Sequence, residues 1–193
     1  DVSNAALQAV DLPHDFLIEN ENDLYETTDA WYLRTLDVPE SWCASCVLVR
    51  FDGVYMDCDV LLNGHIVCTH HYGYTAFDVH LTSLLLVGRN TLAVHVRHQS
   101  PNSRWYSGAG IYRDVTLHVL PKRHIPLDGV YVTTTHELES WTMTIDTELC
   151  GVKDNGVLTH VLLDGDVPVC DVTVEAAGDH AHAVMQVLSP KLW

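Results

Sequence analysis

The chain contains 193 residues, and its 10 basic against 26 acidic side chains give a formal net charge of −16. This excess of negative charge repels phosphate backbones and anionic lipid surfaces, so we expect neither a nucleic-acid partner nor a membrane partner. The 47% hydrophobic and 19% charged content suits one or two packed domains, and no apolar run approaches the ~20 residues of a membrane-spanning helix.

Short runs of alternating apolar and polar residues fill the first half of the chain. This period of two is typical of half-buried strands, and long helical patterns are missing. Asn63 and Gly64 predict a two-residue hairpin turn, because both tolerate the positive φ of a type I′ turn. Residues 78–86 predict a short helical turn that Gly88 ends. The alternation predicts strands at residues 30–38, 47–51, 57–62, 65–70, 91–96 and 111–120.

A break in this alternation falls between Pro121 and Pro126, where basic and imidazole side chains replace the apolar ones. We place a domain boundary there, which gives domains of residues 1–121 and 122–193. Turns are expected at Asn155-Gly156 and at Asp164-Gly165. Strand starts about a dozen residues apart are typical of an immunoglobulin-like β-sandwich. The predicted strands of the second domain are residues 130–135, 142–149, 157–163, 169–174 and 181–187.

Six cysteines lie in a chain that is too large to need disulfide staples. Cys43 and Cys46 form a Cys-x-x-Cys pattern, but they follow Trp42 in a predicted loop, whereas a redox motif opens a helix after a strand. No second cysteine pair lies nearby to complete a zinc site. Residues 1–4 lack the basic and apolar regions of a signal peptide. These features favour free thiols and a cytoplasmic protein.

The segment 102–115 carries the residues that are best suited to ligand binding. Trp105 and Tyr106 offer flat apolar faces to the C–H surface of a pyranose ring. Asn102 and Arg104 can hydrogen-bond the hydroxyl groups of a sugar. The alternative for Trp105 is a place in the hydrophobic core.

This segment, Asn-Ser-Arg-Trp-Tyr-Ser-Gly-Ala-Gly-Ile-Tyr-Arg-Asp-Val, resembles one found in glycoside hydrolase family 2, the family of β-galactosidases, β-glucuronidases and β-mannosidases. Three further pieces resemble the amino-terminal region of that family in order and spacing: Leu-Pro-His-Asp at 12–15, Arg-Phe-Asp-Gly-Val-Tyr-Met at 50–56 and Leu-Asn-Gly-His at 62–65. In the family, the Leu-Pro-His-Asp piece looks structural and fixes the entry of the chain into the first domain. The ending Ser-Pro-Lys-Leu-Trp at 189–193 is similar to the approach to the catalytic barrel of the family.

The resemblance implies an all-β fold. A jelly-roll, galactose-binding-like β-sandwich comes first, an immunoglobulin-like β-sandwich follows, and in the family a (β/α)8 barrel with both catalytic glutamates comes third. In relatives the tail continues through a further strand, so we expect the second sandwich to be truncated and to lack its last strand. Because this leaves a sheet edge unpaired, we expect either contacts with another copy of the chain or disorder near the carboxyl end of the fragment. Because the loop of family 2 galactosidases extends toward the mouth of the barrel, the resemblance implies that Asn102, Arg104 and Trp105 bind substrate.

Catalytic and metal-binding residues are not expected in this part of the protein. Retaining hydrolysis needs two carboxyl groups about 5 to 5.5 Å apart, and no pair here stands in a context that resembles the acid or nucleophile motifs of the family. The adjacent His70 and His71 point to opposite faces of a strand, and His180 and His182 lack an evident third ligand. The resemblance allows sodium or magnesium in the full-length enzyme and assigns no cofactor to this fragment.

The sequence therefore predicts the non-catalytic amino-terminal portion of a family 2 enzyme, a retaining glycosidase whose fragment is inactive alone. The Asn-Ser-Arg-Trp-Tyr form of the loop favours a β-galactosidase. Expected partners are a β-galactoside or related glycan, the protein's own catalytic barrel, and further copies in a homo-oligomer. The alternative is a stand-alone carbohydrate-binding module, which would have no use for an approach to a barrel. A secreted adhesion sandwich is disfavoured by the unpaired cysteines.

Overall fold

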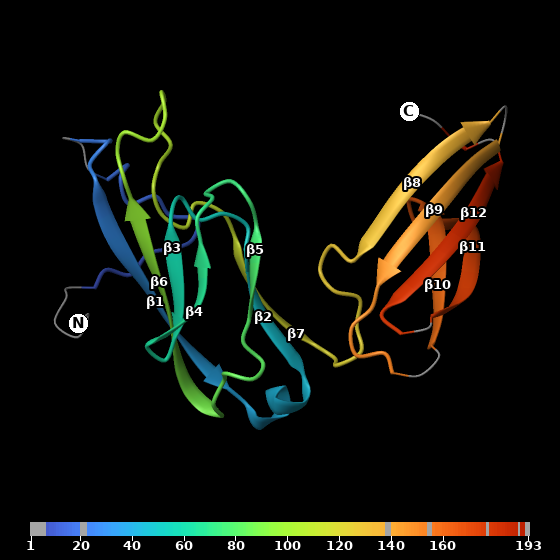
Figure 1. Ribbon diagram of the computed structural model, residues 1–193, viewed down its shortest axis with the longest axis horizontal. Coiled ribbons are helices and arrows are strands. Elements are labelled where there is room, and N and C mark those ends of the chain that lie inside the picture. The colour runs from blue at the N-terminus through green and yellow to red at the C-terminus, as the bar shows by residue number, and fades with distance from the viewer. Residues whose placement is uncertain are drawn as a thin grey trace. The chain divides into compact units, whose positions relative to one another are not determined.

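The computed structural model describes residues 7–19, 23–137, 140–153, 156–176, 178–188 and 190–191. Its chain divides into two units, Asp1–Val119 and Leu120–Trp193. The regular secondary structure of both units is almost entirely β-strand (Figure 1), which confirms the all-β fold class. Among the described residues there is no helix of the length and apolarity that a membrane crossing requires.

The first unit contains two sheets, with strand orders β1-β6-β3-β4 and β5-β2-β7. Within the first sheet, β6 pairs antiparallel with both β1 and β3 and thus forms its centre. The elements are β1 (Thr28–Val38), the 3-10 helix η2 (Glu40–Ala44), β2 (Cys46–Phe51), β3 (Cys58–Leu62), β4 (His65–His70), β5 (Phe77–His80), β6 (Gly88–His98) and β7 (Val115–Leu120).

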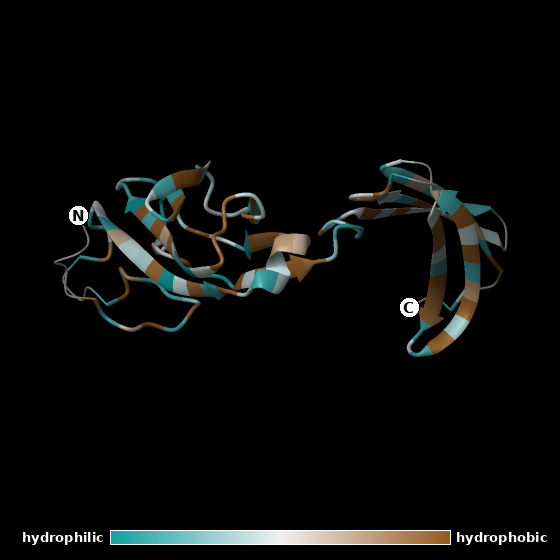
Figure 2. Ribbon diagram, turned by 90° about the horizontal axis from the view of Figure 1, so that it is seen from below, coloured by the Kyte–Doolittle hydropathy of each residue, from teal (hydrophilic) through white to brown (hydrophobic). Residues whose placement is uncertain are grey.

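Alternate side chains along these strands form the hydrophobic core of the first unit. Val60 on β3 and Val96 on β6 are fully buried, and Phe51 on β2 stacks on Phe77 of β5 with ring centroids 5.0 Å apart. Apolar and polar bands alternate along the strands in Figure 2, as the period of two predicts. Each fully buried valine or phenylalanine contributes about 1.5–3 kcal/mol to folding relative to an exposed one.

The Asn63-Gly64 hairpin forms as predicted. Both residues have positive φ, 50° and 84°, and they join β3 directly to β4. The side chain of Asn63 also accepts a hydrogen bond from the N–H of Thr91 at 2.9 Å and donates to the buried Asn90 at 2.9 Å. The turn is thereby fixed to the central strand β6.

Three sequence predictions for the first unit need correction. Residues 77–80 form β5 instead of the start of a helical turn, and only a single turn follows, in which the N–H groups of Leu84 and Leu85 bond to the C=O of Leu81. The short strand was missed because only two of its four residues are apolar. The strand predicted from residue 111 begins at Val115, since Ile111 uses its C=O to pair with His14. Cys43 lies in η2, a 3-10 helix that the sequence did not predict.

The second unit is a smaller sandwich with sheet orders β12-β9-β8 and β10-β11. Met185 and Val187 on β12 and Ile145 on β9 form its buried centre, against which Leu162 and Val172 of the other sheet pack. The Asp164-Gly165 turn joins β10 to β11 as predicted, with Gly165 at φ 63°. The strands are β8 (Val130–Glu137), β9 (Ser140–Glu148), β10 (Gly156–Asp164), β11 (Val167–Ala176) and β12 (His180–Leu188).

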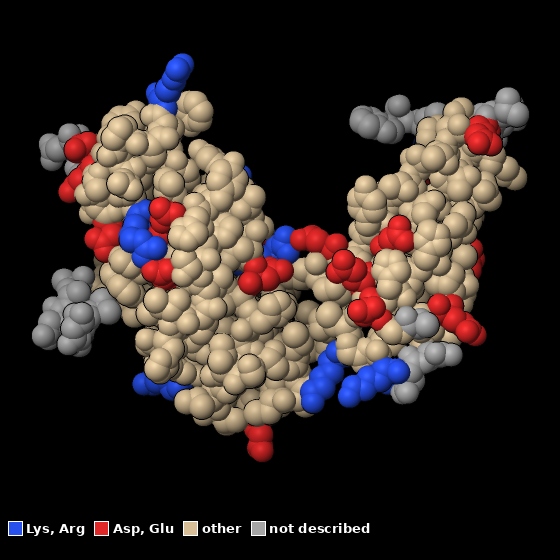
Figure 3. Space-filling model, in the orientation of Figure 1, with Lys and Arg blue, Asp and Glu red and all other residues tan. Residues whose placement is uncertain are grey.

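An edge of the second unit is solvent-exposed. Among the described strands, β8 lies at the end of its sheet, and all of its residues are exposed. The predicted approach to a barrel includes Ser189, Leu192 and Trp193, and the predicted turn at 155–156 includes Asn155; these residues lie outside the described ones. On the face shown in Figure 3, acidic side chains occur on both units, in agreement with the net charge of −16.

Candidate functional site

The loop between β6 and β7 is held in place by the carboxylate of Asp15. Its Oδ2 accepts a hydrogen bond from the Tyr106 hydroxyl at 2.6 Å, and its Oδ1 accepts from the N–H groups of Ala109 and Leu17, both at 3.0 Å. Gly108 is required beside it, because a Cβ there would lie 2.6 Å from Oδ2 and the residue has φ +74°. Burial, followed by the bond to Asp15, raises the pKa of Tyr106 above its ordinary value, so the phenol remains a hydrogen-bond donor.

His14 holds the other end of the same loop. Its main-chain N–H donates to the C=O of Ile111 at 2.7 Å, and its side-chain Nδ1 lies 2.8 Å from the hydroxyl of Tyr32. Burial raises the pKa of Tyr32 to about 12. A Cβ on Gly110 would lie 2.5 Å from both the His14 carbonyl oxygen and the Tyr32 hydroxyl. The Leu-Pro-His-Asp piece therefore anchors the loop, a structural role, and its histidine faces a phenol and the carboxylate of Glu19 at 3.3 Å.

A hollow of about 450 Å³ opens beside this loop, and Asn102, Arg104 and Trp105 all line it. The structure thus brings the predicted substrate-binding residues together around one space. Trp105 is 63% exposed, which excludes the alternative of a core position. Residues that the sequence analysis did not select complete the lining: Tyr55, Met56, Tyr72, Gly73, Tyr74 and Ser103.

Tyrosines from two other loops form an aromatic wall of the hollow. The ring of Tyr74 meets the ring of Tyr55 edge-on at 5.4 Å and that of Tyr72 at 5.7 Å. Tyr55 is only 5% exposed and exchanges two main-chain hydrogen bonds with Gly110, at 2.9 and 2.8 Å. Burial raises the pKa of Tyr55, which keeps its hydroxyl protonated. The run Tyr72-Gly73-Tyr74, between the predicted strand 65–70 and the predicted helical turn 78–86, was the sequence signal that could have identified this wall.

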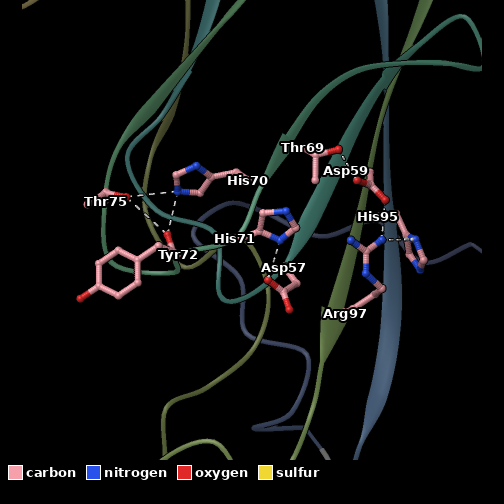
Figure 4. Close-up of polar contacts among 9 residues, drawn as sticks. All are labelled: Asp57, Asp59, Thr69, His70, His71, Tyr72, Thr75, His95 and Arg97. Atoms are coloured by element: carbon pink, nitrogen blue, oxygen red, sulfur yellow. Dashed lines mark hydrogen bonds and ion pairs between the residues drawn. The ribbon is translucent and has the colours of Figure 1, made fainter.

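Two histidines support the loop that carries Tyr72 and Tyr74 (Figure 4). The Nε2 of His70 lies 2.7 Å from the C=O of Tyr72 and 3.2 Å from the Thr75 hydroxyl, and its ring stacks on Phe77. His71 instead bonds to Asp57 at 3.1 Å. The adjacent rings have different partners, and His71 lies beyond the end of β4, so the predicted alternation of faces along a strand does not extend to it. Both rings shape the loop.

The other histidine pair lies on the second unit. His182 and His180 approach the same carboxylate oxygen of Asp146, at 2.7 and 3.4 Å, and the hydrogen bond from His182 lowers the pKa of Asp146. Within the described part of the chain, no group of three or more histidine, cysteine or acidic side chains is arranged to hold a metal ion. The described residues that line the hollow include no carboxylate.

Comparisons with known proteins agree with this architecture. A family model described as "glycosyl hydrolases family 2, sugar binding domain" matches residues 8–121. A β-galactosidase of Bacteroides ovatus is 37% identical over 66% of the chain, and a putative β-glucuronidase of Formosa agariphila is 26% identical over 100% of it. These alignments cover only 16% and 20% of the two relatives, so the chain spans less than a quarter of their length.

Solved structures give the same result. A glycosyl hydrolase family 2 member from Bacteroides cellulosilyticus superposes on 100% of the chain with a TM-score of 0.85 and 27% identity, over 30% of its own length. A β-glucuronidase from Bacteroides uniformis covers 96% of the chain with a TM-score of 0.83 and 27% identity, over 25% of its own length. The chain belongs to glycosyl hydrolase family 2: residues 8–121 match the sugar binding domain of the family, and the chain corresponds to the amino-terminal region of family members.

Proposed function

We propose that this chain is the non-catalytic front part of a retaining β-galactosidase, in which the hollow forms one wall of the sugar pocket. A catalytic barrel outside this chain would supply the two carboxyl groups that retaining hydrolysis needs. The lining of the hollow is suited to binding a sugar and not to cleaving it, because it offers aromatic faces, an amide and a guanidinium but no described carboxylate. On this proposal the fragment alone does not cleave glycosides.

The exposure of Trp105 is the observation that carries the proposal. An indole that is 63% exposed contributes little to the core, yet it stands in a hollow beside Asn102 and Arg104. Stacking of the C–H face of a galactose ring on this indole would bury apolar surface on both partners. Arg104 would donate hydrogen bonds to sugar oxygens, and Asn102 would hold a hydroxyl group.

A β-glucuronidase is the second candidate, and Arg104 is the observation that favours it. A guanidinium in a hollow without a described carboxylate can pair with the carboxylate of a uronic acid. The relatives include proteins named for each activity. The closer identity to the Bacteroides ovatus β-galactosidase, 37% against 26%, supports the galactoside.

The test compares p-nitrophenyl β-galactoside with p-nitrophenyl β-glucuronide as substrates of the full-length protein. Preferential hydrolysis of the galactoside supports the proposal, and preference for the glucuronide assigns the second candidate. The Trp105→Ala variant should lower kcat/KM about threefold to tenfold, the value of one aromatic contact. Its melting temperature should stay within about 2 °C of the parent, because surface substitutions change stability little.

Trp31→Ala is the matched control. Trp31 lies on β1 of the same unit, is 38% exposed and stacks on His95 away from the lining of the hollow. This variant should leave kcat/KM unchanged. If Trp105→Ala has a lower melting temperature but unchanged kinetics, Trp105 supports the fold and does not contact the sugar. Glycan binding by the isolated chain at micromolar concentration would instead favour a stand-alone carbohydrate-binding module.

The exposed edge strand β8 supports a further proposal, that copies of the protein associate through the second unit. An edge strand with free main-chain groups pairs readily with a strand of another chain, and β8 is exposed along its whole length. Analytical ultracentrifugation of the full-length protein tests this. A monomer at all concentrations would contradict it.

A further inference from the structure

His98 connects the core of the first unit to the candidate site. It is the last residue of β6, and only 3% of it is exposed. Its Nδ1 lies 2.7 Å from the C=O of Glu26, and its Nε2 lies 2.9 Å from Nδ2 of Asn102. No step of the proposed function uses this buried imidazole directly.

The partners of His98 determine which ring nitrogen carries the proton. A carbonyl oxygen only accepts hydrogen bonds, so Nδ1 must bear the hydrogen that points to Glu26. Nδ2 of Asn102 faces Nε2, and an amide nitrogen only donates, so Nε2 is the acceptor of that hydrogen bond. The orientation of that amide has a second, independent support, because Nδ2 also donates to the C=O of Gln99 at 3.0 Å. If the amide were turned the other way, Oδ1 of Asn102 would face the carbonyl oxygen of Gln99, and neither atom can donate a hydrogen bond.

The same network determines what Asn102 can offer to a ligand. Both hydrogens of its amide are engaged, one with His98 and one with Gln99. Its Oδ1 accepts from the Ser107 hydroxyl at 3.2 Å and keeps capacity for one further donor. Asn102 therefore presents an acceptor, and a ligand group that meets it must donate.

We propose that His98 is a positioning residue that fixes the amide of Asn102 with its oxygen available, so that the site recognises a sugar hydroxyl as a hydrogen-bond donor. This inference rests on the proposed function, in which Asn102 contacts the sugar. It goes beyond that function by assigning a role to a core residue and by giving the contact a direction. A sugar in which fluorine replaces that hydroxyl keeps an acceptor and loses the donor, so it should bind more weakly.

Two substitutions separate positioning from general support of the fold. The terminal oxygen of glutamine in His98→Gln can reach the place of Nε2, so this variant keeps the acceptor for Asn102 and loses the donor to Glu26. The amide nitrogen in His98→Asn matches Nδ1, so this variant keeps the donor to Glu26 and loses the acceptor for Asn102. Both variants remove the ring from the core, and we expect similar falls in melting temperature.

Kinetics of the full-length protein with p-nitrophenyl β-galactoside should distinguish the two variants. We expect His98→Asn to lower kcat/KM about tenfold, as expected for one lost hydrogen bond. His98→Gln should stay within about threefold of the parent. Equal losses in both variants, or parental kinetics in His98→Asn, would overturn the assignment.

Nuclear magnetic resonance of the parent protein tests the network even if a variant does not fold. Nitrogen-15 shifts should show the imidazole of His98 with hydrogen on Nδ1 and not on Nε2, and a scalar coupling across the hydrogen bond should join Nε2 of His98 to Nδ2 of Asn102. Hydrogen on Nε2, with or without hydrogen on Nδ1, or the absence of that coupling would overturn the inference. Parental kinetics in Asn102→Ala would instead refute the proposed sugar contact, while these spectra would still decide the role of His98.

Discussion

Replacing Gly73 by alanine should disturb the aromatic wall of the hollow. A Cβ at this position would lie 2.3 Å from Cδ2 of Tyr55 and 2.9 Å from its Cγ. Carbon atoms in contact normally stay about 3.5–4.0 Å apart, so the ring must move by roughly 1 Å or more. The main chain of Tyr55 cannot follow freely, because it exchanges two hydrogen bonds with Gly110.

The size of the effect follows from two opposing contributions. Overpacking of a well-packed site costs about 1–3 kcal/mol. Alanine also restricts the unfolded chain, which offsets about 0.4–1 kcal/mol. The midpoints of these two ranges give a net loss of about 1.3 kcal/mol in the free energy of unfolding of the first unit. For a unit of this size, that loss lowers the melting temperature by roughly 4–8 °C.

Differential scanning calorimetry measures this change, and Gly156→Ala serves as its control. At Gly156 on β10 the nearest atom to an added Cβ is Val152 Cγ1 at 3.9 Å, an ordinary contact. That variant should melt no lower than the parent, because the added methyl group meets only an ordinary contact and alanine restricts the unfolded chain. If Gly73→Ala has the melting temperature of the parent, the prediction is refuted, because the ring of Tyr55 can then move aside at little cost in spite of its main-chain hydrogen bonds. Reduced kcat/KM in Gly73→Ala would further connect the wall to the site.

Two further predictions concern ionisable groups of the first unit. A hydrogen bond from Arg97 holds the pKa of Asp59 below its usual range (Figure 4). The ionised carboxylate therefore stabilises the fold at pH values above the pKa of Asp59 in the unfolded chain. This stabilisation is lost as the pH falls through the pKa of Asp59 in the folded protein. Arg97→Met should return the pKa of Asp59 toward its usual value in a carbon-13 titration, and an unchanged titration would contradict this. Burial raises the pKa of the Cys58 thiol to about 12, so iodoacetamide at a pH of about 8 should label the exposed Cys43 and spare Cys58. Labelling of Cys58 at the rate of Cys43 in the folded protein would refute that expectation.

Local sequence patterns determined most of the secondary structure of this protein. Alternation with a period of two identifies strands because neighbouring side chains of a strand face opposite sides of a sheet. Asn63 and Gly64 specify their turn because few other residues adopt positive φ at low cost. The four-residue strand β5 escaped prediction because two apolar residues are too few to show a period.

The candidate site could be predicted only in part. Asn102, Arg104 and Trp105 follow one another in a polar loop, so their chemistry was visible in the sequence. Tyr55 and Tyr74 come from other loops, and their place in the same hollow depends on how the strands pair across the sheets. Pairing between distant segments is set by core packing and strand register, which local propensity does not encode.

The sequence by itself determined a chain of β-strands with an aromatic, arginine-containing loop. Only the tertiary structure decided how that loop is held, because Asp15 meets Ala109 across 94 positions of the chain. The same holds for Asn102, whose amide orientation depends on a buried histidine that a separate contact to Glu26 fixes. Hydrogen-bond direction depends on three-dimensional neighbours, and these exist only once the two sheets have closed over the core.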